Sequence, residues 1–318
     1  MSDRYLLILV LYTLACFGTV LALTQGLLWL LREPLLRAIA RLSAKDGVVA
    51  HVILNALPAI VAFLLTSFSA VPGYFNGEPI GTHELPGAAL IALAALGAYF
   101  VLAPLGATCA MIYRTRVRTD GWQGSARNVD SFADVPVVEV GSERAFVAAA
   151  GLLNKRIFLS SPVRSLLSTR ELRAVLRHEV AHCDQRHNFA RLLVAASPRL
   201  FSCTAFEDSF RETIEYAADD AVLDVPGDAL NLASAVVTLA RRTVPASGML
   251  YSGIVEPTNA VLLKRRVDRM VLLQPRSTGK KLRQITIGCT ALLAATTLIG
   301  SLPLAQEAFR ETLELLVR

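Results

Sequence analysis

The stretch L-R-H-E-V-A-H-C-D at residues 176–184 contains an H-E-x-x-H motif inside a segment that has the apolar spacing of a helix. A spacing of four places His178 and His182 on one helix face, one turn apart, where both can bind one Zn²⁺. Glu179 lies beside the first histidine, where it can accept a proton from the attacking water. The motif therefore predicts one zinc per chain, with His178 and His182 as metal ligands and Glu179 as the catalytic base.

The residues around the motif predict where its helix begins and ends. Ser168 and Glu171 form an S-x-x-E capping box, which is a helix start signal. Apolar residues then follow at helical spacing, at Leu172, Val175, Leu176 and Val180. We predict a helix that starts after Ser168 and ends near residues 186–188.

A catalytic zinc site needs a third protein ligand in addition to water. In a metzincin that ligand is a histidine six residues after the second one, and Asn188 occupies this position here. His187 is one residue short, so we predict that it lies on the surface. The third ligand must then come from another segment.

An acidic segment at residues 211–220 is the candidate source of that ligand. Glu215 and Asp219 lie four residues apart, so they share a face of a predicted second helix. Glu215 can bind the metal, while Asp219 accepts a hydrogen bond from a ligating imidazole and fixes its tautomer. Glu212, one turn earlier, is the alternative ligand.

The H-E-x-x-H helix followed by E-x-x-A-D at residues 215–219 resembles the gluzincin membrane metallopeptidases. These include the CAAX-type and heat-shock quality-control proteases and the BlaR/MecR-type antirepressor family. The resemblance covers residues 135–220 by motif and the whole chain by topology. It implies Glu215 as the third ligand and Asp219 as the partner of an imidazole. It assigns no oxyanion-stabilising residue, because the later His-Pro of the CAAX-type and heat-shock proteases is missing after His187.

The composition is typical of a membrane protein, with 53% hydrophobic residues and a mean hydropathy of +0.48. A spanning helix needs about 20 apolar residues, and residues 5–31, 51–71, 87–113 and 284–305 meet that need. We predict a multi-pass α-helical membrane protein with four spans and an α+β gluzincin-like zinc protease domain between spans three and four. Its parts are the three-span region 1–113, the protease domain 114–283, the fourth span 284–305 and a short extracytoplasmic tail 306–318.

Lysine and arginine are unevenly distributed among the loops, and cytoplasmic loops carry an excess of them. Basic residues lie between spans one and two, after span three and before span four, at Arg32, Arg37, Arg41, Lys45, Arg114, Arg116, Arg118, Lys280, Lys281 and Arg283. None lies between spans two and three. We predict an inner (cytoplasmic) membrane protein with both termini outside and the protease domain in the cytoplasm. This order of spans is that of the BlaR/MecR-type proteins, whereas the heat-shock type has two spans before its zinc helix.

Inside the protease domain, residues 135–140, 145–150 and 156–160 are predicted strands. Residues 146–148 are the candidate edge strand for an extended substrate, with an ordinary core strand as the alternative.

Residues 229–242 are a predicted helix and residues 245–258 a mobile loop. Residues 261–273 are predicted as a basic amphipathic helix that anchors the domain at the membrane, with Lys264, Arg265, Arg266 and Arg269. The S-x-x-K at residues 277–280 lies on the predicted cytoplasmic side, so we reject it as an acylating motif.

The charge of the protease domain indicates which kinds of partner it binds, and the cysteines indicate whether it contains disulfides. Residues 113–283 carry 25 Lys and Arg against 18 Asp and Glu, which favours attraction to the anionic lipid bilayer. No aromatic-basic interleaving accompanies this charge, so we expect no direct nucleic-acid binding. The five cysteines have no ligand spacing and indicate no disulfide framework.

These features predict a membrane-embedded zinc metalloendopeptidase, a hydrolase that cleaves a cytoplasmic or membrane-proximal protein. The resemblance implies regulatory proteolysis in signal transduction, with a cytoplasmic transcriptional repressor as one candidate substrate. A membrane-protein quality-control protease with the same chemistry is one alternative. A non-enzymatic membrane signalling scaffold is another, and the intact set His178, Glu179, His182 and Glu215 argues against it.

Overall fold

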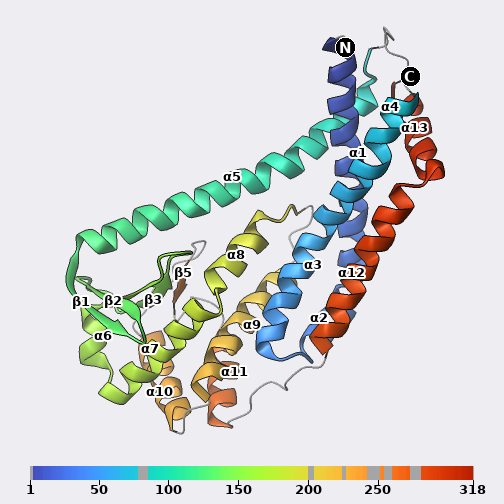
Figure 1. Ribbon diagram of the computed structural model, residues 1–318. Helices are drawn as coiled ribbons and strands as arrows, with labels where there is room; N and C mark the ends of the chain where they lie inside the picture. The colour runs from blue at the N-terminus through green and yellow to red at the C-terminus, as the bar shows by residue number, and fades with distance from the viewer. Residues whose placement is uncertain are drawn as a thin grey trace.

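The computed structural model describes residues 3–77, 85–199, 204–223, 227–241, 251–253, 260–272 and 281–317. A bundle of long helices contains both ends of the chain, and a domain of strands and shorter helices lies at the opposite end of the molecule (Figure 1). The predicted loop 245–258 falls outside the described residues except for positions 251–253, and the S-x-x-K segment falls outside them entirely.

The helical bundle contains the first three predicted spans. They correspond to α1 (Asp3–Leu30), to α3 (Ala44–Leu65) with its continuation, and to α5 (Ala88–Gly124). The continuation of α3 is a π-helical turn, η1 (Thr66–Ala70), followed by α4 (Val71–Gly77). By length and composition, three helices among the described residues can cross a membrane. Their outer faces are apolar and uncovered, as at Leu23 and Leu102, which are 69% and 66% exposed.

Helices α1 and α5 cross at a pair of glycines. A Cβ added to Gly18 would lie 2.7 Å from the Cα of Gly97, and a side chain at Gly97 would collide with the backbone of Leu14. Small residues let helix backbones approach this closely in a membrane. The two glycines therefore allow α1 and α5 to pack closely at this crossing.

The predicted fourth span is a bent helix pair rather than one straight helix. Helix α12 (Lys281–Gly300) is followed at Pro303 by α13 (Pro303–Val317), and the two meet at an angle of 71°. Residues 284–305 straddle this bend, so the fourth span remains a prediction. Helix α13 packs back against α4, where a Cβ on Gly73 would lie 2.5 Å from the backbone oxygen of Gln306.

A five-stranded sheet forms the frame of the second domain, in the order β1-β2-β4-β3-β5. The strands are β1 (Ala126–Phe132), β2 (Val135–Val140), β3 (Val147–Ala150), β4 (Arg156–Ser160) and β5 (Tyr251–Gly253). Among the described strands, β2 and β4 pair in parallel and the other neighbours are antiparallel. Strand β5 pairs with residues 148–150 of β3, so β3 is not the edge strand of the described sheet. Within the candidate edge 146–148, only Ala148 is paired with β5.

Six helices complete this domain within the described residues. They are α6 (Ser161–Leu166), α7 (Thr169–Asp184), α8 (His187–Ala196), α9 (Thr204–Leu223), α10 (Asp228–Ala240) and α11 (Ala260–Val271). A further short helix, α2 (Arg32–Ile39), lies between α1 and α3 in the chain. Helix α7 begins at the predicted capping box, where Ser168 N donates to Glu171 at 2.8 Å. Its apolar face packs on the sheet around Val175, Ile157 and Leu159, which are all fully buried. The motif helix is thus fixed against the sheet.

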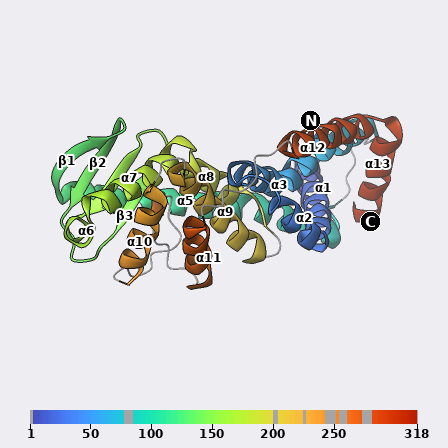
Figure 2. The ribbon, with the colours of Figure 1, turned by 90° about the horizontal axis from the view of Figure 1, so that it is seen from below.

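Helix α3 of the bundle packs directly against α9, as the view from below shows (Figure 2). The shared core consists of Ala44, Val48, Ala190, Val194, Phe210, Ile214, Tyr216 and Ala217. A Cβ on Gly47 would lie 2.8 Å from Thr213, so the glycine permits the close approach. His51 and Ser209 add a side-chain hydrogen bond of 3.1 Å. The bundle therefore holds the helix that carries Glu215.

Candidate metal centre

Helices α7 and α9 bring three ligand-type side chains to one buried point. The Nε2 atoms of His178 and His182 lie 3.0 Å apart. The Glu215 carboxylate lies 3.6 Å from the first and 3.8 Å from the second. All three side chains are at most 2% exposed, and they form a group that could hold a metal ion.

The dimensions of this triangle fit a small tetrahedral metal. Ligand bonds of 2.0–2.1 Å in a tetrahedron place the donor atoms about 3.3 Å apart, close to the three distances above. Both carboxylate oxygens of Glu215 are buried without a hydrogen bond among the described residues. Arg266 and Arg191 form ion pairs with these oxygens, which offset part of the desolvation cost of the buried carboxylate, and a metal ion would offset more of it. The donor set of two imidazoles and one carboxylate is also one that zinc favours.

The alternative ligand Glu212 lies outside this group. Its Oε1 accepts a hydrogen bond of 2.6 Å from the Tyr216 hydroxyl and pairs with Arg265 at 3.3 Å. Arg265 is largely exposed, so Glu212 belongs to the outer face of α9. The geometry favours Glu215 over Glu212.

Asp219 contacts His178 on the side of the ring away from the triangle. Its Oδ1 lies 3.0 Å from His178 Nδ1, which leaves Nε2 directed at the metal position. Burial alone lowers the pKa of His178, but contacts with Asp219 and Glu215 outweigh it and raise that pKa to about 9. A carboxylate in this position fixes the tautomer of a ligating imidazole.

His187 is buried, so its predicted surface location is wrong. Helix α7 ends at Asp184, and Arg186 adopts a left-handed conformation with φ of 54° before α8 begins. This turn directs His187 back toward the site, where its Nδ1 lies 2.8 Å from His182 Nδ1. Burial lowers the pKa of His187 to about 3, so the ring is neutral and can accept a hydrogen bond from His182. His187 thus contacts the Nδ1 atom of His182, just as Asp219 contacts the Nδ1 atom of His178.

Replacing His187 tests this contact. His187→Phe keeps a ring of similar size but removes the hydrogen-bond partner of His182, and we expect zinc affinity to fall about 10–100-fold. His187→Asn, which can still form a hydrogen bond, should lose less. Competition with a chromophoric chelator measures both affinities. Equal affinity in the phenylalanine variant and the wild type would show that His187 only fills space.

Glu179 lies next to the triangle and is held by the sheet. Its Oε2 accepts a hydrogen bond of 2.7 Å from Ala149 N on β3, while Oε1 has no hydrogen bond among the described residues. Burial raises the pKa of Glu179 to about 8, although the His178 charge opposes the shift. A carboxylate with one anchored and one open oxygen is well placed to accept a proton.

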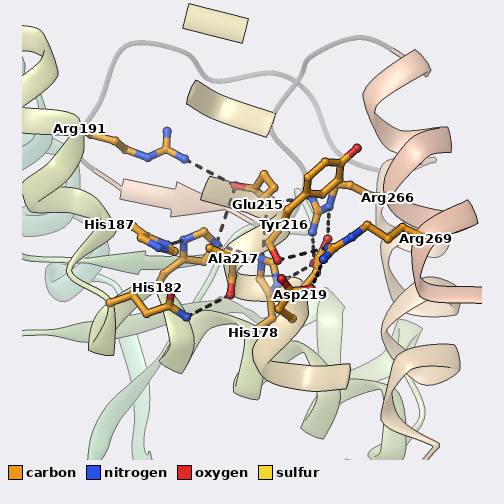
Figure 3. A network of polar contacts seen from close by, with 12 residues as sticks. His178, His182, His187, Arg191, Glu215, Tyr216, Ala217, Asp219, Arg266 and Arg269 are labelled. Atoms are coloured by element: carbon orange, nitrogen blue, oxygen red, sulfur yellow. Dashed lines mark hydrogen bonds and ion pairs between the residues drawn. The ribbon is translucent and has the colours of Figure 1, made fainter. Parts of the chain in front are cut away.

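Two arginines complete the site from opposite sides (Figure 3). Arg191 on α8 lies 3.6 Å from Glu215 Oε1, and Arg266 on α11 lies 2.8 Å from Glu215 Oε2. Arg269, one turn further along α11, stacks over the Tyr216 ring at 4.7 Å. Arg266 and Arg269 therefore point into the domain. The prediction that the basic residues of α11 anchor the domain at the membrane is wrong for these two.

Residues 125–248 match the family model of Peptidase family M48. The M48 match begins at the end of α5 and contains β1 to β4, the triangle and Glu179. No curated protein matches the chain. The match supports a protease of the metallopeptidase type, whereas the BlaR/MecR subtype stays a prediction.

Proposed function

We propose that this protein is a membrane-embedded, zinc-dependent endopeptidase that cleaves a cytoplasmic or membrane-proximal protein. The observation that carries the proposal is the buried triangle of His178, His182 and Glu215, with Glu179 beside it, inside the M48-matching segment. The three apolar helices support a site near the membrane surface.

Each residue of the site has a separate task in peptide hydrolysis. His178, His182 and Glu215 would hold a zinc ion, which would polarise the scissile carbonyl and make the attacking water more acidic. The open oxygen of Glu179 accepts the water proton and later delivers it to the leaving amine. The Ala149 N–H keeps the other Glu179 oxygen in place throughout. Asp219 and His187 hold the two ligand imidazoles in the tautomer that leaves each Nε2 available.

Strand β3 supports the proposed path of the substrate. Ala149 donates its N–H to Glu179, so a peptide strand beside β3 runs close to the metal position. The chain itself supplies such a strand, because Tyr251–Gly253 pairs antiparallel with β3. An extended substrate must displace β5 or join the sheet beyond it. The segment 245–258, to which β5 belongs, is therefore itself a candidate substrate.

The biological role we favour is regulatory proteolysis, with a cytoplasmic repressor as the substrate class. Quality control of membrane proteins is the alternative, and it uses the same chemistry. Comparing the proteins that accumulate in cells with the Glu179→Gln variant separates the two. A single accumulating regulator supports the first role, whereas many unrelated membrane proteins support the second.

The proposed orientation can be tested with reporter fusions. A topology reporter fused after Glu78 should be active outside the cytoplasm, and one fused at Thr243 should be active inside it. The reason is that the loop between spans two and three contains no lysine or arginine, whereas the segments that flank the peptidase domain are basic. An outside signal at Thr243 would contradict the proposed compartment and redirect the substrate search to extracytoplasmic proteins.

A further inference from the structure

Arg266 lies on α11, outside the M48-matching segment, and yet it reaches the metal centre. The residue is only 3% exposed. A buried guanidinium is costly unless each of its donors meets a partner. The partners of this side chain therefore explain why the chain tolerates a charge at this position.

The Arg266 guanidinium joins two carboxylates that lie one turn apart on α9. Its Nε and Nη2 donate to Oδ2 and Oδ1 of Asp219 at 3.0 and 2.9 Å. Its Nη1 pairs with Glu215 Oε2 at 2.8 Å. One planar group thus contacts both the third ligand and the carboxylate behind the first ligand, as Figure 3 shows. A lysine ammonium cannot reproduce this fork, because it is a single point charge.

Neighbouring arginines of α11 make different contacts. Arg265 is largely exposed and pairs with Glu212 on the outer face of α9. Arg269 pairs with Asp220 and donates to the backbone oxygen of Tyr216. Of these three arginines, Arg266 is the one that contacts residues of the metal centre, through Asp219 and Glu215. Adjacent positions of one helix therefore provide a site residue and a matched control.

We propose that Arg266 is a positioning residue of the metal centre, which holds Asp219 against His178 and orients the Glu215 carboxylate toward the metal. It acts through these two carboxylates and has no part in the chemistry itself. The inference rests on the proposed zinc site. Its consequence is that the M48-matching segment is incomplete by itself, because the centre also needs an element that follows residue 248.

The test uses the full-length chain purified in detergent and freed of metal. Zinc affinity is measured by chelator competition, and the absorption spectrum of added Co²⁺ reports the geometry of the ligands. Arg266→Gln should weaken zinc binding about 10–100-fold and alter the cobalt spectrum. Arg266→Lys should recover part of the affinity, because it restores charge without the fork. Arg265→Gln should leave both readouts unchanged.

A double variant tests whether Arg266 acts through Asp219. If it does, Asp219→Asn combined with Arg266→Gln should weaken zinc binding less than the product of the two single effects. If Arg266→Gln does not fold, the comparison between Arg266→Lys and wild type decides the question by the same two readouts.

Wild-type zinc affinity and an unchanged cobalt spectrum in the Arg266 variants would overturn the inference and leave the proposed function in place. Absence of zinc and cobalt binding in the wild type would overturn the proposed function, and the inference with it.

Discussion

Glu179→Gln is expected to abolish proteolysis while the zinc stays bound. The amide keeps the size of the side chain and can still form hydrogen bonds, but it cannot accept the proton of the attacking water. Loss of a positioned general base costs about 10²–10⁴ in rate, so we expect activity to fall at least about 100-fold. Metal content should not change, because Glu179 lies outside the ligand triangle.

Two measurements check this result. The rate is followed with a fluorescently labelled unfolded protein and by mass spectrometry of the chain's own 245–258 segment, and zinc is counted by elemental analysis. Glu143→Gln is the matched control, because Glu143 is an exposed carboxylate of the same domain. Unchanged cleavage in Glu179→Gln would remove the case for an enzyme and favour a membrane scaffold.

Glu215→Ala is expected to remove most of the zinc that the wild type holds at about one ion per chain. The triangle supplies three protein ligands, and a catalytic zinc site rarely has more. Without the Glu215 carboxylate, only the two imidazoles remain as protein ligands, and water can reach more of the metal position. Glu212→Ala is the matched control, because Glu212 lies one turn away on the same helix and pairs with Arg265 instead.

Elemental analysis gives the metal content, and thermal unfolding provides an independent check. A ligand that binds only the folded state stabilises it by RT ln(1 + [L]/Kd). Added zinc should therefore raise the melting temperature of the wild type and of Glu212→Ala, but not that of Glu215→Ala. The reverse pattern, with zinc lost from Glu212→Ala and kept by Glu215→Ala, would show that the ligand assignment is wrong.

The parts of this site that are predictable from sequence depend on local rules. The start of α7 follows from the capping box at Ser168, and the shared face of His178 and His182 follows from helical geometry. The four-residue spacing on α9 and the need for a third ligand indicated Glu215 with Asp219 but left Glu212 as the alternative, and the choice of Glu215 came from the family resemblance. The apolar spans are equally local, because about 20 consecutive apolar residues are enough to indicate them.

The parts that were not predictable depend on tertiary contacts. His187 reaches the site through a left-handed turn at Arg186, a conformation that non-glycine residues rarely adopt and that no neighbouring residue signals. Arg266 looks like part of a solvated basic face, because arginine is rarely fully buried unless it is paired. Its partners lie on a different helix, 47 residues away in the case of Asp219. Likewise, β5 has only three residues, too few for a recognisable strand pattern.

The packing of α3 on α9 joins the helical bundle to the proposed metal site. The proposed site cannot be separated from the helical bundle, because Phe210 and Ile214 of α9 are covered by α3, which is one of the three candidate spans. A tilt or rotation of α3 would press on Thr213, two residues before Glu215, through the contact at Gly47. The contacts thus run without a break from an apolar candidate span to the residue two positions before Glu215, so the bundle and the proposed metal site form one packed unit.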